Sequence, residues 1–163
     1  MIALKVEDVK TFTSKLFLKE DFDQFLVKEA DIVTYNSFSI DGHIRQGYYT
    51  AEEMEESGIE AFSSWKTLRP VCFSLIKGKK LPGSFHIVLL LAPLDVEKFA
   101  SASGCGIDGS QIQGLYLNIR YEDGALYCVT GTSLNYFTMD KTLEKEWDRT
   151  VTEFMRSHDI VCI

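Results

Sequence analysis

Residues 8–14 read Asp-Val-Lys-Thr-Phe-Thr-Ser, and residues 95–101 read Asp-Val-Glu-Lys-Phe-Ala-Ser. The two stretches share the pattern D-V-x-x-F-x-S. Each follows an apolar stretch, and each precedes an Asp-Gly pair flanked by strand-like residues (Asp41-Gly42 and Asp123-Gly124). An internal repeat constrains architecture more tightly than composition does, so the pattern predicts one unit of strand, helix and hairpin that is used twice.

The two copies divide the chain into four expected segments. Residues 1–44 and 84–139 form two β-α-β-β(-β) units, residues 45–83 form a helical insertion, and residues 140–163 form a C-terminal helix and tail. A chain of 163 residues usually folds around a single core. We therefore predict one α+β domain of two repeated units, with an inserted helix and a C-terminal helix.

Periodic patterns place the elements of this domain. Apolar residues at helical spacing predict helices over residues 8–18, 62–76 and 140–157. Pro70 lies inside the second pattern and predicts a kink or a break near Arg69, because proline lacks the N–H that a helix uses.

The strands are predicted from alternation and turns. Residues 115–121 alternate between two faces, as a strand does. Asp-Gly favours type I′ turns, because both central residues must tolerate positive φ, so both Asp-Gly pairs predict turns between strands. A further strand is expected over residues 134–139. The apolar tail, residues 160–163, is expected to dock on the domain.

The repeated unit resembles one domain of the DNA sliding clamps. Residues 115–130 (LYLNIRYEDGALYCVT) are similar to the clamps' recurrent hairpin, and residues 3–12 (ALKVEDVKTF) to their opening strand and first helix. The resemblance covers residues 1–44 and 84–139, and it implies a scaffold that works by presenting surfaces. The whole chain also resembles a small family of uncharacterised bacterial proteins, and this second resemblance implies no activity.

The composition narrows the functional classes. A net charge of −7 argues against a general affinity for nucleic acid or anionic membranes, which require basic surfaces. The longest apolar run, residues 87–92, is far shorter than the roughly 20 residues of a membrane-spanning helix. The four cysteines lack the spacing of a metal site, which favours free thiols in a cytoplasmic protein without a metal or cofactor.

Two patterns match catalytic or cofactor-binding motifs by spacing alone. Residues 104–109 match G-x-G-x-x-G, but here a helix precedes and a strand follows, which is the reverse of a dinucleotide site. Ser74 and Lys77 have the S-x-x-K spacing of acylating serine enzymes, but at the end of a helix. The three histidines lie in separate elements. We therefore predict no catalytic, cofactor-binding or metal-binding residue.

Two clusters in the insertion are candidate contact sites. The basic residues are Lys66, Arg69, Lys77, Lys79 and Lys80. They could contact phosphate or nucleic acid, or they could interact with the dipole at the C-terminal end of the inserted helix. The aromatic residues Tyr48, Tyr49 and Trp65 could form a protein interface. Alternatively, Trp65 anchors the inserted helix to the core.

These observations favour a non-catalytic binding or interaction module with an unidentified protein partner. Self-association is expected if a sheet edge is uncovered, because an open edge strand pairs readily. One alternative is a DNA-associated clamp relative that uses residues 77–80, although the first repeated helix balances Lys10 and Lys15 against two acidic residues. A second alternative is an enzyme of unrecognised type, which requires a deep pocket with His86 or Cys105 beside a carboxylate.

Overall fold

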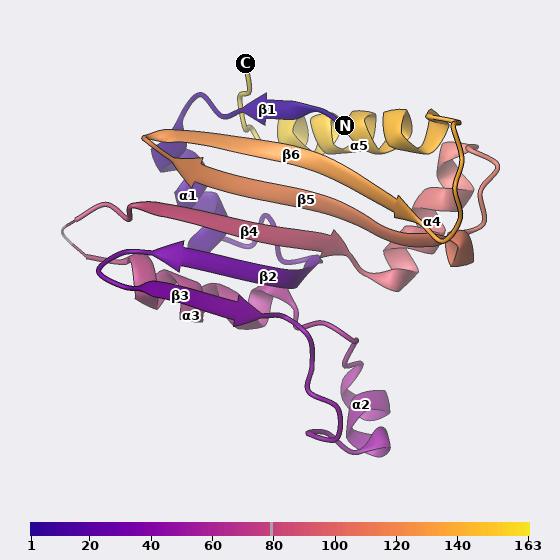
Figure 1. Ribbon diagram of the computed structural model, residues 1–163, viewed down its shortest axis with the longest axis horizontal. Coiled ribbons are helices and arrows are strands. Elements are labelled where there is room, and N and C mark those ends of the chain that lie inside the picture. Colours follow the sequence, from indigo (N-terminus) through magenta and orange to yellow (C-terminus); the bar gives the residue numbers. More distant parts are fainter. Residues whose placement is uncertain (79) are drawn as a thin grey trace.

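The protein forms an antiparallel sheet with helices on one face (Figure 1). The computed structural model describes residues 1–78 and 80–163. The strands are β1 (Ala3–Lys5), β2 (Phe25–Val33), β3 (Ser37–Asp41), β4 (Ser84–Leu91), β5 (Ile112–Glu122) and β6 (Ala125–Leu134). The helices are α1 (Val9–Phe17), α2 (Ala51–Ser57), α3 (Trp65–Ile76), α4 (Pro93–Ser103) and α5 (Thr142–Ser157), with a 3-10 turn at Gly109–Gln111. The predicted α+β class is confirmed.

The two copies share the order of their elements and the pairing of their last two strands, but not the pairing of their first strand. Strand, helix, strand, strand occurs twice, as β1-α1-β2-β3 and β4-α4-β5-β6. The strands lie in the order β1-β6-β5-β4-β2-β3. Within the second copy β4 pairs with β5, whereas β1 pairs with β6 at the edge far from β2. Equivalent elements therefore occupy different positions in the sheet.

One face of the sheet carries the core. On β5, Leu115, Leu117 and Ile119 are fully buried and alternate with the half-buried Tyr116 and Asn118, because successive side chains of a strand point to opposite faces. In Figure 1, α1, α3 and α5 lie behind the sheet. α3 packs on β2 and α5 packs on β6. No helix in the described part of the chain has the length and apolar character to span a membrane.

The two Asp-Gly pairs have different roles. Asp123 and Gly124 form the turn between β5 and β6, with φ of 53° and 77°, as a type I′ turn requires. Asp41 instead ends β3, so the predicted hairpin turn at Asp41-Gly42 is wrong. A Cβ atom at Gly42 would lie 1.8 Å from the carbonyl oxygen of Val27. Glycine is required there for the close approach of two backbones.

Two other predictions are wrong for local reasons. α3 runs through Pro70 without a break. Pro70 lies on the exposed side of the helix, where water can bond to the carbonyl that the proline leaves free. β6 ends at Leu134 and residues 135–141 form no strand, because the chain leaves the sheet there to begin α5. The insertion also contains α2 in addition to the predicted helix.

The tail docks on the domain, as predicted. Ile160 is buried, and Val6 and Cys162 form a β-bridge. The N–H of Ile163 donates a hydrogen bond to the carbonyl of Lys5 (2.8 Å). The tail therefore pairs with the last residue of β1 and with the two residues that follow this strand.

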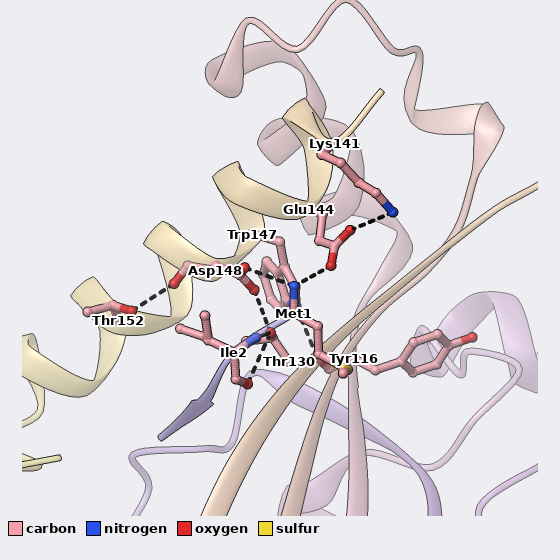
Figure 2. A network of polar contacts seen from close by, with 9 residues as sticks. All are labelled: Met1, Ile2, Tyr116, Thr130, Lys141, Glu144, Trp147, Asp148 and Thr152. Carbon is pink, nitrogen blue, oxygen red and sulfur yellow. Dashed lines mark hydrogen bonds and ion pairs between the residues drawn. The ribbon is translucent and has the colours of Figure 1, made fainter. Parts of the chain in front are cut away.

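A polar network joins the start of β1 to α5 (Figure 2). The α-amino group of Met1 contacts the carboxylates of Glu144 and Asp148, the second at 3.1 Å. The hydrogen bond with Glu144 raises the pKa of this amine. Asp148 also accepts a hydrogen bond from the hydroxyl of Thr130, which in turn accepts one from the N–H of Ile2 (2.9 Å). The network holds β1, β6 and α5 together.

Candidate ligand-binding groove

A groove of about 840 Å³ lies between α1 and the end of α3, and we name it the α1–α3 groove. Its walls come from one side of α1, the last residues of α3 and residues 80–82. The start of β4 and the β5–β6 turn contribute the rest of the lining. In Figure 1 these segments meet at the left end of the sheet, on its helical face. Segments that are distant in sequence therefore build one concave site.

α1 presents two neighbouring stripes of residues. Phe12 and Leu16 are fully buried and face the core. Lys10, Ser14 and Leu18 are spaced four residues apart and all line the groove, because residues at i and i+4 lie on the same side of a helix. One helix thus contributes to both the core and the groove wall.

Asp8 fixes the start of this wall. Its carboxylate accepts hydrogen bonds from the N–H (3.1 Å) and the hydroxyl (2.6 Å) of Thr11, which is the role of a helix cap. These bonds lower the pKa of Asp8. At the other end of the helix, the N–H of Leu18 donates to the carbonyl of Ser14 (2.9 Å).

The floor of the groove is aromatic. Phe17, Phe85 and Tyr121 line it and are buried. The rings of Phe17 and Phe85 meet edge to face at 5.5 Å, and those of Phe85 and Tyr121 stack at 5.3 Å. Trp65 supports Phe17 from the core side at 5.8 Å, and its indole N–H donates to the carbonyl of Leu16 (2.9 Å). Each ring is held by its neighbour, so the floor is preformed.

The walls leave apolar side chains in contact with solvent. Leu18 at the end of α1 is 59% exposed, and Leu81 in the α3–β4 connection is 83% exposed. Phe73 and Ile76 of α3 also line the groove; both are half-buried and pack against the core. The groove is therefore apolar from its floor to its rim.

The groove carries charge of one sign. Lys10, Lys77 and Lys80 line it and are exposed, and no described aspartate or glutamate does so. The chain as a whole has a net charge of −7, so the local sign is the opposite of the global one. Thr13 and Tyr121 add hydroxyl groups to the lining. This arrangement can hold an anion at the rim while an apolar group covers the floor.

The predicted basic cluster is divided in the structure. Lys77 and Lys80 line the groove, whereas Lys66 lies in the first turn of α3, about 16 Å from Lys77 along the helix axis. Arg69 is held by Asp23 through two hydrogen bonds of 3.0 Å, and both side chains are largely buried. Arg69 therefore links α3 to the α1–β2 connection. Lys79 lies outside the described residues.

The predicted aromatic interface is also divided. Tyr48 is 75% exposed, and Tyr49 is half-buried with its ring edge-on to Tyr48 at 4.9 Å. Both precede α2, which projects away from the sheet in Figure 1. Trp65 is fully buried, so its place in an interface is corrected: it anchors α3 to the core. Its large apolar surface explains that position.

The remaining titratable side chains do not gather at the groove. His158 contacts Asp21 on the far side of α1 from the groove lining, with 2.9 Å between Nδ1 and Oδ2. His86 and Cys105, which an enzyme was expected to use, do not line the groove. Within the described residues there is no group of three or more side chains that could ligate a metal.

Sequence reasoning missed Lys10 as a site residue. In the sequence, the acidic residues at the start of the helix balance the charge of Lys10. The available signal was its spacing with Ser14 and Leu18, which places a lysine, a hydroxyl and a leucine on one side of α1, beside the core stripe.

Comparisons with known proteins give a family without an activity. No curated protein and no solved structure matches the chain. The model of the family described as "Family of unknown function (DUF5721)" matches residues 15–162, which include the α3 side of the groove, while Val9, Lys10, Thr13 and Ser14 of the α1 wall precede the match. The match extends over nearly the whole chain, and the expected membership of an uncharacterised family is confirmed: the chain belongs to this family of unknown function.

Proposed function

We propose that this protein is a non-catalytic binding module whose ligand occupies the α1–α3 groove. One observation carries the proposal: a single concave site combines a buried aromatic floor, exposed apolar walls and charges of one sign. Its volume of about 840 Å³ lies within the range of roughly 300–1,000 Å³ that is typical of small-molecule sites.

The exposed leucines support this role. Single exposed leucines are common on protein surfaces. Leu18 and Leu81 differ because they come from distant segments and flank the same concavity. Removing apolar surface from water is favourable by roughly 25 cal/mol per Å². A ligand in the groove would cover both leucines and gain this free energy.

The cysteines support a site of action in the cytoplasm. All four lie within the described residues and are free thiols. Burial raises the pKa of Cys72 to about 11 and also raises that of Cys128, so both thiols stay protonated at neutral pH. Free thiols persist in reducing compartments.

The binding of a neutral apolar dye tests the proposal. Nile red should bind to the purified full chain with increased fluorescence and a stoichiometry of one. Ser14→Phe places a ring in the groove wall and should abolish this binding. Ser101→Phe is the matched control, because Ser101 occupies the same position of the repeat on an exposed part of α4.

Equal dye binding by the two variants would contradict the proposal. Circular dichroism and thermal unfolding establish that both variants are folded. Leu81→Glu provides a second groove variant that does not touch the core, since Leu81 is 83% exposed. Its control is Leu94→Glu on α4, a leucine that is 67% exposed and does not line the groove.

A further inference from the structure

We infer that the ligand of the α1–α3 groove is a single-chain acyl amphiphile with an anionic head group, bound as an individual molecule. The inference rests on the proposed function, because it names the ligand of the same site. The charge, the lining and the form of the groove support this ligand.

The charge of the groove selects an anionic head. Lys10 comes from α1, whereas Lys77 and Lys80 come from the chain that follows α3, so two segments that are distant in sequence bring lysines to one site. The rest of the protein carries an excess of acidic residues, which repels anions elsewhere on the surface. The positive charge that lines the groove is therefore opposite in sign to the net charge of the protein.

The lining selects an apolar tail. Phe17 and Phe85 form the floor, and Leu18 and Leu81 extend the apolar surface to the rim. An acyl chain has no polar groups that would need partners in such a lining. Lysine suits the boundary between tail and head, because its methylene stem covers apolar surface while its ammonium group stays in water.

The form of the groove selects one flexible chain. The site is concave, and its volume is that of a small-molecule site. Nucleic acid would use the lysines but would leave the aromatic floor without a partner, because phosphate contacts are electrostatic. A flexible tail can cover the floor and both leucines together, while the head remains near the lysines.

The head-group preference is measured with three ligands that share one tail. Dodecanoate, dodecanol and dodecylammonium are used below their micelle concentrations to displace Nile red from the wild-type chain. Dodecanoate should bind at least roughly tenfold more tightly than dodecylammonium, as three exposed charge contacts allow. Affinity should rise by about threefold per methylene from octanoate to dodecanoate.

Two triple variants separate local from global charge. The groove variant is Lys10→Gln, Lys77→Gln, Lys80→Gln, and the control is Lys66→Gln, Lys98→Gln, Lys145→Gln. All six lysines are exposed, and both variants change the net charge equally. Measured against the Nile red affinity of each variant, the groove variant should lose the preference for dodecanoate over dodecylammonium, whereas the control should keep it.

Failure of the inference differs from failure of the proposed function. If dodecylammonium binds as tightly as dodecanoate, or if the two triple variants weaken dodecanoate equally, the anionic ligand is wrong while the groove remains a binding site. Displacement of Nile red by duplex DNA at low salt, lost in the groove variant, would favour nucleic acid instead. If Ser14→Phe leaves Nile red binding unchanged, the groove itself is not the site.

Discussion

α1 and α4 carry the same seven-residue pattern and have different surroundings. Phe12 of α1 is 1% exposed, whereas Phe99 of α4 is half-buried and edge-on to Trp147 at 5.7 Å. Asp8 precedes α1 and caps it, whereas Asp95 lies inside the first turn of α4. The shared letters thus specify two helices but not two equivalent environments.

The difference follows from the strands that precede the helices. α1 follows β1 at an edge of the sheet, and α4 follows β4 in its interior. Lys10 and Ser14 consequently line the groove. Glu97, the counterpart of Lys10 in α4, lies instead against Gly109, where an added Cβ would be 3.0 Å from the Cγ of Glu97. The comparison teaches that sheet position decides which copy lines the groove.

The largest expected effect is on the free energy of unfolding, and it should differ between the two phenylalanines of the repeat, Phe12 and Phe99. Phe12→Ala should lower the free energy of unfolding by about 3–5 kcal/mol, because it leaves a cavity beside Phe22 in the core. Phe99→Ala should cost about half as much, since part of its ring is already in water. Urea unfolding of both variants measures the difference. Equal losses would mean that the two helices have equivalent roles in the core.

The two Asp-Gly pairs offer the next comparison. Gly42→Ala should destabilise the protein by about 3 kcal/mol, because its Cβ would overlap the backbone of Val27. Gly124→Ala should cost about 1 kcal/mol, since only its positive φ opposes a side chain. Thermal unfolding compares them. A larger cost at Gly124 would contradict the assignment of Gly42 as a site of close backbone approach.

Asp8 and Asp95, the first residues of the two repeats, should differ in how their contributions to stability depend on pH. Asp8→Ala should lower stability at neutral pH, because two hydrogen bonds at the start of α1 are lost. The folded-state pKa of Asp8 is lowered below its unfolded value of about 3.9, so its contribution is complete above that pH and is lost as the pH falls through the folded pKa. The deficit of Asp8→Ala relative to wild type should therefore shrink on acidification below about pH 4.

Asp95→Ala is the control for this experiment. Asp95 lies within the first turn of α4, where it makes no capping hydrogen bond of the kind that Asp8 makes. Its replacement should have the smaller effect at neutral pH. A deficit for Asp8→Ala that persists unchanged at pH 2 would show that the carboxylate is not its source.

The smallest effect on stability tests the groove itself. Lys10→Glu should change the free energy of unfolding by no more than about 0.5 kcal/mol, because Lys10 is exposed. It should weaken dodecanoate binding by roughly fivefold, since it places a like charge beside the anionic head. Glu97→Lys at the matching position of α4 should leave binding unchanged. Displacement of Nile red measures both.

The sequence predicted what depends on nearby residues. The helical stripe of Phe12 and Leu16, the alternation of residues 115–121 and the turn at Asp123-Gly124 follow from spacing within one element, and the structure confirms all three. The docked tail was predicted from its apolar composition alone.

Features that depend on distant pairing were not predicted. β1 lies at the far edge of the sheet, beside β6. This position depends on long-range strand order, which the sequence of β1 does not specify. The same is true of Gly42, whose role depends on the backbone of β2. The groove was not predicted: Lys77 and Lys80 were named as a possible phosphate contact, but the apolar floor beside them comes from Phe17, Phe85 and Tyr121, which lie far apart in the sequence.

The docked tail makes the two edges of the sheet unequal. Residues 161–163 pair with Lys5 at the end of β1 and with the two residues that follow it, whereas no described strand pairs with the outer side of β3. A sheet with two open edges can add copies without limit, as fibres do. A sheet with one open edge can pair only once, with the same strand of a second copy, so that any edge-to-edge association is finite. Removal of residues 161–163 would therefore leave more of the second edge of the sheet open to pairing.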